Sequence, residues 1–536
     1  MLNICGFMEI KGKHVWYIIL IIVLFTSLFI NLNVSLTEPL IFGDEGWWAS
    51  RGKWILNNLE IPKYTEILSQ SEAFRSFFLE QPIFMFLVSS AFLVGGEMLV
   101  KALNPILGFL LGIVVFLFAR RVYSTKIGVL STLFLIMFPS FITYQVLLYS
   151  EVFAILMVTV AIYFFYRGFE EDRKILFFVL GGILSGIAAI TEVGSIIMPL
   201  VFLFIFVLYK KNWLRNFSLV LGIFLVLFIP LYGIHNYLLL GNPGLPRIDD
   251  IFGLERKEIL KDLPEGEFGK LRTPTEVGGG TGSTILNMGI VNYIDFAYDL
   301  VPFVFASIGL AAISLSRKRK DILIAGVFVL FLLTSFLATS AGRSEDAARN
   351  MLYIVPFLSI FCGLGTFKIY EFLKNYGENT GKVMGIMFVF ILLCFSLLSA
   401  QAKAESLRPI KEFSPAFFNG CDWIRRNTPE GSLLVTLWQH RARYACERDS
   451  IYASSPGGEE MLLAGNETTY EIMKLHGADY VYIQKFSVQP GRDMVSYPWV
   501  FVRYVQNSDH FEKVYEYPQN CMFSNNQDCV VVYKVL

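Results

Sequence analysis

Long apolar stretches without charged residues recur through the first 400 positions of this 536-residue chain. A helix needs roughly 20 apolar residues to cross the hydrocarbon core of a bilayer, and a soluble domain has no use for many such segments. Twelve runs approach this length: 15–34, 82–96, 102–119, 127–148, 152–166, 175–191, 195–209, 217–240, 291–315, 322–340, 351–367 and 383–400. The chain is therefore predicted to be a polytopic α-helical membrane protein.

The charge content agrees with lipid as the main solvent and excludes two classes of protein. Hydrophobic residues make up 54% of the chain and charged residues 17%, whereas about 25% of residues are charged in ordinary soluble domains. Basic and acidic residues number 45 each, so the net charge is zero. A nucleic-acid partner would require a basic face, and the longest basic tract is 317–320. These observations exclude a soluble enzyme and a nucleic-acid-binding protein.

Short loops rich in Lys and Arg predict the orientation, because such loops face the cytoplasm. Three of them lie between the runs, at 120–126, 210–215 and 317–320. If every run crossed from a cytoplasmic N-terminus, these loops would lie outside. The run 82–96 is short for a crossing and ends at Gly95-Gly96-Glu97, so we predict a re-entrant or juxtamembrane helix there. About eleven crossings remain in residues 1–400, and the segments 35–100, 241–290 and 401–536 lie outside.

The polar tail, residues 401–536, is predicted to be a separate extracytoplasmic α/β domain. A helical pattern at 417–427 is followed by β-branched or aromatic segments at 432–438, 480–484 and 530–535. The tail also holds four of the seven cysteines. Two disulfides are expected on an oxidising side of the membrane, and among the three pairings we favour Cys421 with Cys446 and Cys521 with Cys529. Four free thiols in a cytosolic domain are the alternative.

Ionisable residues near the membrane gather at the outer ends of the predicted spans, where a charge avoids the cost of the hydrocarbon core. They are Asp44, Glu45, Glu151, Glu192, His235, Asp295, Asp299, Arg343 and Arg349. Taken singly, each fits a solvated residue at the membrane interface. Together, acids and strong cations on one surface can handle an anionic lipid headgroup and a hydroxyl nucleophile.

The pair Asp44-Glu45 stands out because glycines bracket it and two tryptophans follow. Gly43 and Gly46 permit tight turns, and Trp47-Trp48 is typical of a membrane interface. A helix is predicted from here through Trp54 to Asn58, with Asp44 as its N-cap. Capping and catalysis are both compatible with this position.

The segment 41–55, Ile-Phe-Gly-Asp-Glu-Gly-Trp-Trp-Ala-Ser-Arg-Gly-Lys-Trp-Ile, resembles the first external loop of the C-type membrane glycosyltransferases. This superfamily contains protein O-mannosyltransferases, aminoarabinose lipid A transferases and oligosaccharyltransferases. Further matches follow in family order and cover most of residues 10–400. They are Gln81-Pro82, Tyr149-Ser150-Glu151, 186–191, Asn236-Tyr237, 241–243, and Arg349 with Leu352, Tyr353 and Pro356.

The resemblance implies a transferase that passes a sugar from a polyprenyl- or dolichyl-phosphate donor to an acceptor on the outer face, usually with inversion. Asp44 matches the catalytic aspartate and Glu151 a second acidic position, so the candidate catalytic residues are Asp44, Glu45 and Glu151. Arg349, Arg343 and His235 are the candidates for binding the donor phosphate, because a guanidinium binds phosphate bidentately. No metal is expected to be required; a Mg²⁺ or Mn²⁺ ion, if present, would take oxygen ligands from Asp44 and Glu151. The partners are the donor lipid, membrane lipid, and a protein, lipid or glycan acceptor.

Some residues depart from the family pattern. Glu192 stands where many relatives have Lys or Arg, and His235 stands where Arg is common. The tail resembles the extracytoplasmic domain of archaeal and bacterial relatives, but 437–441, Leu-Trp-Gln-His-Arg, replaces the Trp-Trp-Asp-Tyr-Gly motif of oligosaccharyltransferases. An oligosaccharyltransferase-like enzyme without that motif is one alternative. The other is a transporter or flippase, which would place ionisable groups near the bilayer midplane.

Overall fold

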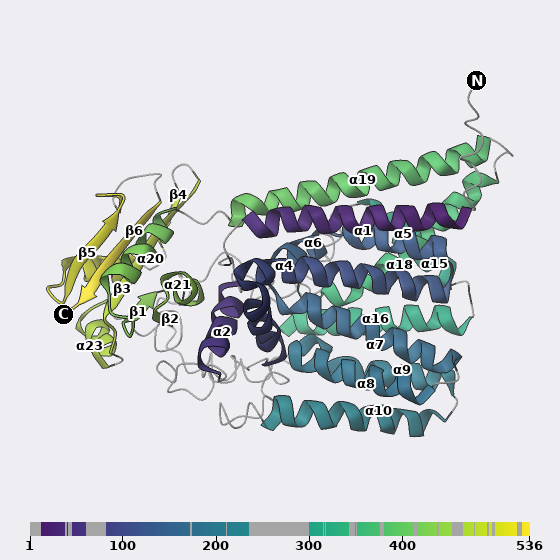
Figure 1. The fold of residues 1–536 in the computed structure, drawn as a ribbon, viewed down its shortest axis with the longest axis horizontal. Helices are drawn as coiled ribbons and strands as arrows, with labels where there is room; N and C mark the ends of the chain where they lie inside the picture. The colour runs from purple at the N-terminus through teal and green to yellow at the C-terminus, as the bar shows by residue number, and fades with distance from the viewer. Residues whose placement is uncertain are drawn as a thin grey trace. The chain divides into compact units, whose positions relative to one another are not determined.

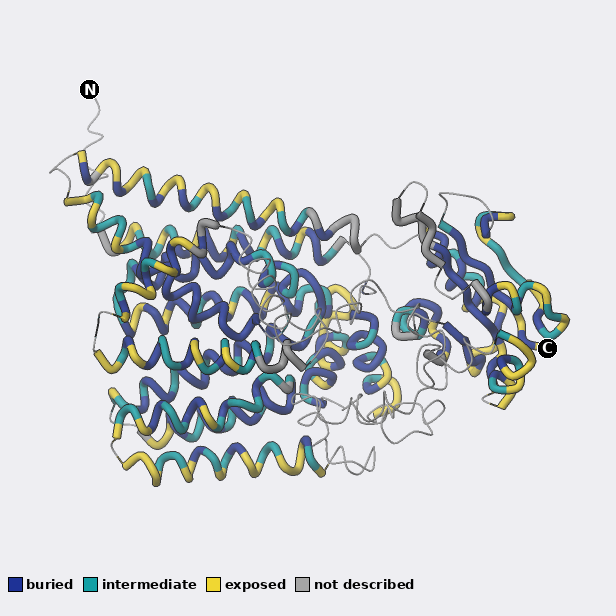
Figure 2. The backbone as a smooth tube through the Cα atoms, turned by 180° about the vertical axis from the view of Figure 1, so that it is seen from behind, coloured by how far each residue is buried: buried dark blue, intermediate teal, exposed yellow. Residues whose placement is uncertain are grey.

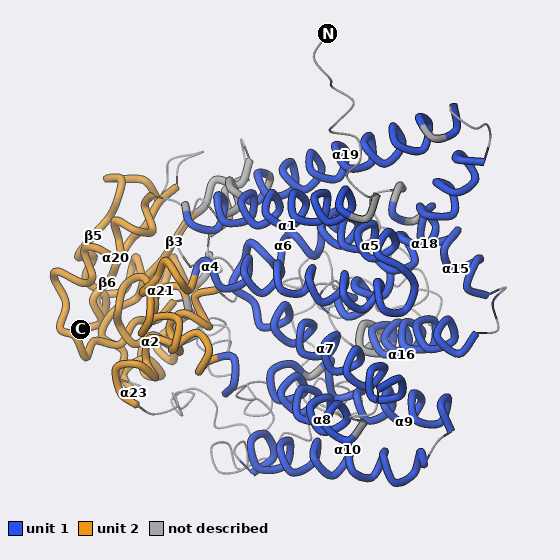
Figure 3. The backbone as a smooth tube through the Cα atoms, turned by 45° about the vertical axis from the view of Figure 1, so that its right-hand side comes forward, with its two compact units in different colours: residues 1–37, 80–84, 101–407 blue, residues 38–79, 85–100, 408–536 orange. Residues whose placement is uncertain are grey.

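The fold is taken from a computed structural model of the chain. It describes residues 12–37, 40, 45–59, 82–171, 174–210, 212–234, 300–314, 316, 318–341, 349, 351–375, 380–411, 415–436, 439–452, 465–475, 477–489, 492–495, 499–522 and 528–536. Two compact units are present (Figure 3). Unit 1 comprises Met1–Thr37, Glu80–Phe84 and Lys101–Leu407, and unit 2 comprises Glu38–Leu79, Met85–Val100 and Arg408–Leu536.

Unit 1 is a bundle of helices that run side by side (Figure 1). Its helices pack pairwise, α7 against α8, α15 against α18, α18 against α5 and α1 against α5. The bounds are α1 (Gly12–Thr37), α4 (Pro82–Val122), α5 (Thr125–Met137), α6 (Pro139–Val146), α7 (Ser150–Glu170), α8 (Lys174–Thr191), η3 (Val193–Ile197), α9 (Met198–Tyr209), α10 (Trp213–Phe228), η4 (Ile229–Ile234), α15 (Leu300–Ser314), α16 (Arg319–Ala341), η6 (Leu352–Ile354), α18 (Val355–Lys374) and α19 (Thr380–Lys411).

The predicted membrane protein is confirmed by the length and composition of these helices. Within the described part of the chain, six helices are long and apolar enough to cross a membrane, and a bent pair raises the number to seven. Three shorter apolar helices accompany them, Ile175–Thr191, Gly194–Tyr209 and Val304–Ser314. Two predicted runs, 217–240 and 291–315, lie partly outside the described residues.

Two breaks in the helices have identifiable causes. Gly95 and Gly96 interrupt α4, and Gly96 takes a φ of +61° that only glycine adopts readily. This break separates the predicted juxtamembrane helix 82–96 from the following run, as the sequence indicated. The run 127–148, predicted as one span, is instead two helices, α5 and α6, bent by 70°. Pro139 begins α6 because its ring clashes with the preceding turn of a continuing helix.

Aromatic residues fill much of the interior of unit 1. Phe165 of α7 packs against Phe202 and Phe206 of α9, with ring centroids 5.6 and 5.9 Å apart. Phe178 of α8 meets Phe206 edge-to-face at 5.1 Å. In contrast, α1, α10 and α19 expose large apolar side chains along much of their length (Figure 2). An apolar exterior around a packed apolar interior is expected where lipid is the solvent.

Unit 2 contains helix α2 (Glu45–Asn58), residues 85–100 of α4, and a mixed sheet with flanking helices. The sheet order is β2-β1-β3-β6-β5, with β4 paired to β3. Strand β1 pairs in parallel with β2 and β3, while β6 is antiparallel to β3 and β5. The bounds are α20 (Pro415–Asn427), β1 (Leu433–Thr436), α21 (Gln439–Cys446), β2 (Asp449–Tyr452), α23 (Glu467–Leu475), β3 (Tyr480–Gln489), β4 (Arg492–Val495), α24 (Trp499–Asn507), β5 (Phe511–Tyr517) and β6 (Cys529–Val535).

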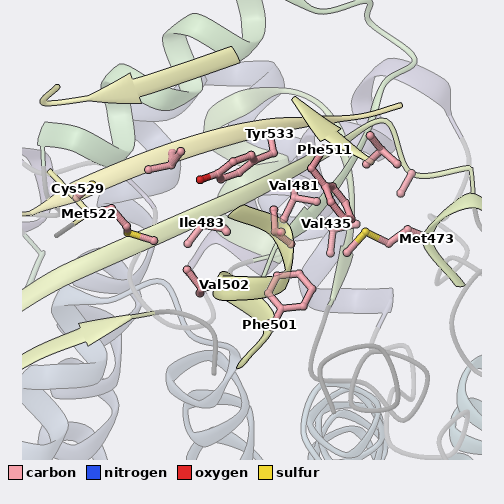
Figure 4. Close-up of a cluster of buried hydrophobic side chains, with 14 of the residues drawn as sticks. Val435, Met473, Val481, Ile483, Phe501, Val502, Phe511, Met522, Cys529 and Tyr533 are labelled. Carbon is pink, nitrogen blue, oxygen red and sulfur yellow. The ribbon is translucent and has the colours of Figure 1, made fainter. Parts of the chain in front are cut away.

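The core of this sheet region is formed by side chains from one sheet face and the helices against it. Val435, Val481 and Ile483 meet Phe501 and Val502 of α24 in a fully buried cluster (Figure 4). The predicted helix 417–427 and the three predicted strands correspond to α20, β1, β3 and β6. Both favoured disulfides, Cys421–Cys446 and Cys521–Cys529, are present.

Candidate active site

Helix α7 connects the two ends of unit 1. At its last turn Glu170 pairs with Arg121, with 2.8 Å between carboxylate oxygen and Nε. Nearby, the Lys320 ammonium donates a 2.6 Å hydrogen bond to the carbonyl of Val122. Members of two basic loops therefore lie at the same end of the bundle. Helix α7 has 21 residues, so its first turn lies about 30 Å from this basic end.

The first turn of α7 carries the candidate acid Glu151. Its carboxylate is buried and accepts a hydrogen bond from Nε of Arg349. The carboxylate side chain is 2% exposed and the arginine side chain 30% exposed. The guanidinium carbon also lies 5.1 Å from the ring centroid of Tyr149. Two candidates from distant parts of the sequence are thus joined in one ion pair beside an aromatic ring.

The loop before Glu151 is held by a buried asparagine that the sequence analysis missed. The Asn104 amide nitrogen lies 3.0, 2.6 and 2.9 Å from the carbonyl oxygens of Tyr144, Leu147 and Tyr149. Asn104 is 1% exposed. It therefore fixes the backbone that leads from the end of α6 into the first turn of α7. The only signal in the sequence was a single amide near the start of the apolar run 102–119.

Neighbouring hydroxyls connect the same region to Glu192. The Ser150 hydroxyl donates to a Glu192 carboxylate oxygen at 3.0 Å. The Ser195 hydroxyl donates to the Tyr353 hydroxyl at 3.0 Å, and both side chains are buried. Glu192 therefore brings a second carboxylate beside Ser150, the residue preceding Glu151.

In unit 2, the buried face of α2 contains charged residues. Glu45, its first residue, is fully buried, and Arg51 is 5% exposed. The Arg51 guanidinium stacks on the Trp47 ring at 3.6 Å and lies 3.7 Å from the sulfur of Met85. The predicted helix from Glu45 to Asn58 is confirmed.

Three predicted site residues, Asp44, His235 and Arg343, lie outside the described residues, as do Asp295 and Asp299. Glu151 and Arg349 are brought together, whereas Glu45 belongs to unit 2. The Arg349 contact also concerns the possible metal site. The Glu151 carboxylate, which would be a ligand of a divalent cation, forms an ion pair with the Arg349 guanidinium. Within the described residues, one of the two proposed metal ligands therefore forms an ion pair.

Comparisons with known proteins found a matching family model and solved structures of similar fold. Residues 81–233 match the family model for dolichyl-phosphate-mannose-protein mannosyltransferase. No curated protein matches the chain. Among solved structures, the archaeal oligosaccharyltransferase AglB from Archaeoglobus fulgidus, in complex with an inhibitory peptide and a dolichol-phosphate, has a TM-score of 0.61 at 13% identity. That alignment covers 95% of this chain and 80% of the other.

Two further structures are similar over most of the chain. ArnT from Cupriavidus metallidurans, bound to undecaprenyl phosphate, has a TM-score of 0.56 at 14% identity and covers 96% of this chain and 98% of its own. The Archaeoglobus fulgidus oligosaccharyltransferase in complex with Zn and sulfate has a TM-score of 0.57 at 15% identity, covering 86% and 67%. The chain thus has the fold of the C-type membrane glycosyltransferases. Together with the family match, this fold confirms the predicted class, a membrane glycosyltransferase.

Proposed function

We propose that this protein transfers a sugar from a polyprenyl-phosphate donor to an acceptor on the extracytoplasmic face, with inversion at the anomeric carbon. The observation that carries the proposal is the Glu151–Arg349 pair at the end of unit 1 opposite the basic loops. In the proposed topology about eleven helices cross the membrane from a cytoplasmic N-terminus. Residues 401–536 are then extracytoplasmic, which agrees with their two disulfides.

Arg349 is proposed to bind the donor phosphate. A guanidinium carries five N–H donors, so one edge can bind a carboxylate while another binds a phosphate. The buried Glu151 carboxylate accepts from Nε and orients the arginine, whose side chain remains about a third exposed. This contact gives Glu151 an orienting role in the site. Arg343 and His235 are proposed as further contacts to the phosphate.

Asp44 is proposed as the general base. In a single displacement, the acceptor hydroxyl loses its proton to the Asp44 carboxylate while its oxygen bonds to the anomeric carbon. The bond from that carbon to the phosphate oxygen breaks at the same time, and the polyprenyl phosphate leaves with the electron pair. One displacement at this carbon inverts its configuration. Arg349 stabilises the negative charge that develops on the departing phosphate.

The proposed reaction does not depend on a metal ion. Arg349 supplies a positive charge at Glu151, where a divalent cation would otherwise bind. If Mg²⁺ or Mn²⁺ is used, Asp44 and Glu151 would be its oxygen ligands. The structurally similar Archaeoglobus fulgidus oligosaccharyltransferase was crystallised with Zn, so the effect of a chelator on sugar transfer is also measured.

The test measures transfer of radiolabelled sugar from lipid-linked donors in membranes that contain the protein. We expect Asp44→Asn to reduce transfer by about 100-fold or more, since general-base catalysis contributes about 10²–10⁴-fold. Glu151→Gln and Arg349→Ala should each reduce it at least tenfold. Glu170→Gln is the matched control, because it breaks a similar ion pair at the other end of the same helix; it should stay within twofold of wild type.

Unchanged transfer by Asp44→Asn would refute the mechanism. Loss of transfer on adding EDTA, with recovery on adding Mg²⁺ or Mn²⁺, would refute metal independence. The assay also separates the competing functions. A flippase would move the donor lipid across sealed vesicles without forming a glycosylated product. An oligosaccharyltransferase-like enzyme would transfer the sugar to an asparagine amide of a peptide and not to a hydroxyl.

A further inference from the structure

Helix α2 packs against helix α21 of the sheet region, and both belong to unit 2. The Lys53 ammonium of α2 forms an ion pair with a carboxylate oxygen of Glu447, at 2.8 Å, just beyond the end of α21. The same ammonium lies 5.8 Å from the ring centroid of Tyr444. One lysine of the first external loop therefore contacts two side chains of the C-terminal region.

Tyr444 extends this interface to a third segment. The Glu97 carboxylate of α4 and the Glu45 carboxylate at the start of α2 both act electrostatically on its hydroxyl. Burial raises the pKa of Tyr444 far above its ordinary value, and Glu97 and Glu45 raise it further. The hydroxyl is therefore protonated at neutral pH and is a hydrogen-bond donor for these carboxylates. We name Lys53, Glu97, Tyr444 and Glu447 the α2–α21 interlock.

The Glu447 end of the interlock is held rigidly. The disulfide Cys421–Cys446 ties the preceding residue to α20. The buried Arg448 donates to the carbonyl of Glu447 at 2.9 Å and to the carbonyl of Thr428 at 2.8 Å. Glu447 itself has a φ of +53°, a left-handed conformation that a non-glycine residue keeps only when its surroundings enforce it. Its carboxylate is thus presented to Lys53 from a fixed backbone.

The other face of α2 is held by α4. At Gly52 an added Cβ would lie 2.5 Å from a methyl carbon of Val88 and 3.1 Å from the backbone nitrogen of Ser89. Such a close approach leaves α2 little freedom to shift along α4. Asp44, the proposed base, is the residue immediately before the first residue of α2.

We propose that the α2–α21 interlock positions helix α2, and with it the residue Asp44 that precedes the helix, so that the C-terminal domain is required for catalysis. Lys53, Tyr444 and Glu447 are positioning residues in this scheme. The inference rests on the proposed role of Asp44. It adds a function for the C-terminal domain that the family match, confined to residues 81–233, does not assign.

The ion pair itself contributes little to folding. Its side chains are 43% and 50% exposed, and exposed pairs of this kind contribute at most about 1 kcal/mol. Lys53 holds the pKa of Glu447 below its usual value by hydrogen bonding, so the pair is fully charged at neutral pH. Reversing one charge should therefore loosen the contact between α2 and α21 without unfolding the chain.

The first experiment is a charge exchange. Lys53→Glu and Glu447→Lys are made singly and together, and kcat and KM for the lipid donor are measured. We expect each single variant to lower kcat about five- to twentyfold, with KM for the donor within about twofold of wild type. The double variant should recover to within about threefold of wild type. The control is the Lys513–Glu516 pair on β5, at 2.8 Å, where the same exchange should leave kcat within twofold.

The second experiment tests the contact independently of activity. Lys53→Cys and Glu447→Cys are combined, and a short bis-maleimide is added to the protein in native membranes. A cross-link is expected in the double variant and not in either single one, which controls for the exposed Cys394. A missing cross-link, or a double charge variant no better than the singles, would overturn the interlock. If the cross-link forms in the double variant but the wild-type protein shows no sugar transfer, the proposed function is overturned instead.

Discussion

At the scale of single residues, the candidate site depends on contacts between side chains far apart in the sequence. Glu151 and Arg349 were both selected from the sequence because each lies at the outer end of a predicted span. Their direct contact joins positions 198 residues apart, and no local pattern encodes such a pairing. Asn104 contributes through three backbone carbonyls of the loop before α7, so its role depends entirely on the fold.

We expect Asn104→Ala to destabilise this loop and reduce transfer. The substitution leaves buried carbonyl oxygens without their donor, which costs about 1–3 kcal/mol in a typical case. Donor KM should rise and kcat fall, because Tyr149 and Glu151 lose their fixed backbone. The measurements are donor kinetics and the thermal midpoint of the detergent-solubilised protein. The control is Asn427→Ala, which removes one exposed hydrogen bond to the carbonyl of Trp423; equal effects of the two variants would contradict the positioning role.

At the scale of helices and strands, the sequence predicts where elements lie better than where they bend. Apolar runs and turn residues located α1, α7 and α18, and segments of β-branched or aromatic residues located β1, β3 and β6. The glycine pair at 95–96 marked the break in α4 because a Gly-Gly step is a strong helix-breaking signal. The 70° bend between α5 and α6 was missed. A proline inside an apolar run is compatible with a kinked but continuous span, so tertiary packing decides the angle.

The packing of α2 on α4 leads to a prediction for Gly52. In a helix interior, Gly→Ala normally stabilises by about 0.5–1 kcal/mol. At Gly52 the new methyl group would collide with the β-branched Val88 and approach the backbone of Ser89. We therefore expect Gly52→Ala to lower both the thermal midpoint and transfer activity, the latter several-fold. At Gly222 of α10 no atom lies within 4 Å of the added carbon, so Gly222→Ala should leave both unchanged or raise stability slightly.

At the scale of the whole molecule, the net charge of zero is a sum over two sets of charged residues that lie in different places. The 45 basic and 45 acidic residues do not mix evenly along the chain. Basic loops lie at one end of unit 1, as the Arg121–Glu170 and Lys320–Val122 contacts show. Glu151, Glu192 and Arg349 lie at the start or end of helices that lead away from that end. The separation of these two sets could be predicted from the sequence because the basic loops are short and are joined by apolar runs about long enough to cross a bilayer.

The last prediction concerns which end of unit 1 faces the cytoplasm. Basic loops are retained in the cytoplasm, so Lys318, which is exposed beside the start of α16, should lie inside, and Glu512 on β5 should lie outside. We expect a membrane-impermeant maleimide added to intact cells to label Glu512→Cys, and to label Lys318→Cys only after permeabilisation. Wild type gives the background from Cys394, which is exposed. The reverse labelling pattern would place the Glu151–Arg349 pair on the cytoplasmic face, and the donor would then have to be used before it crosses the membrane.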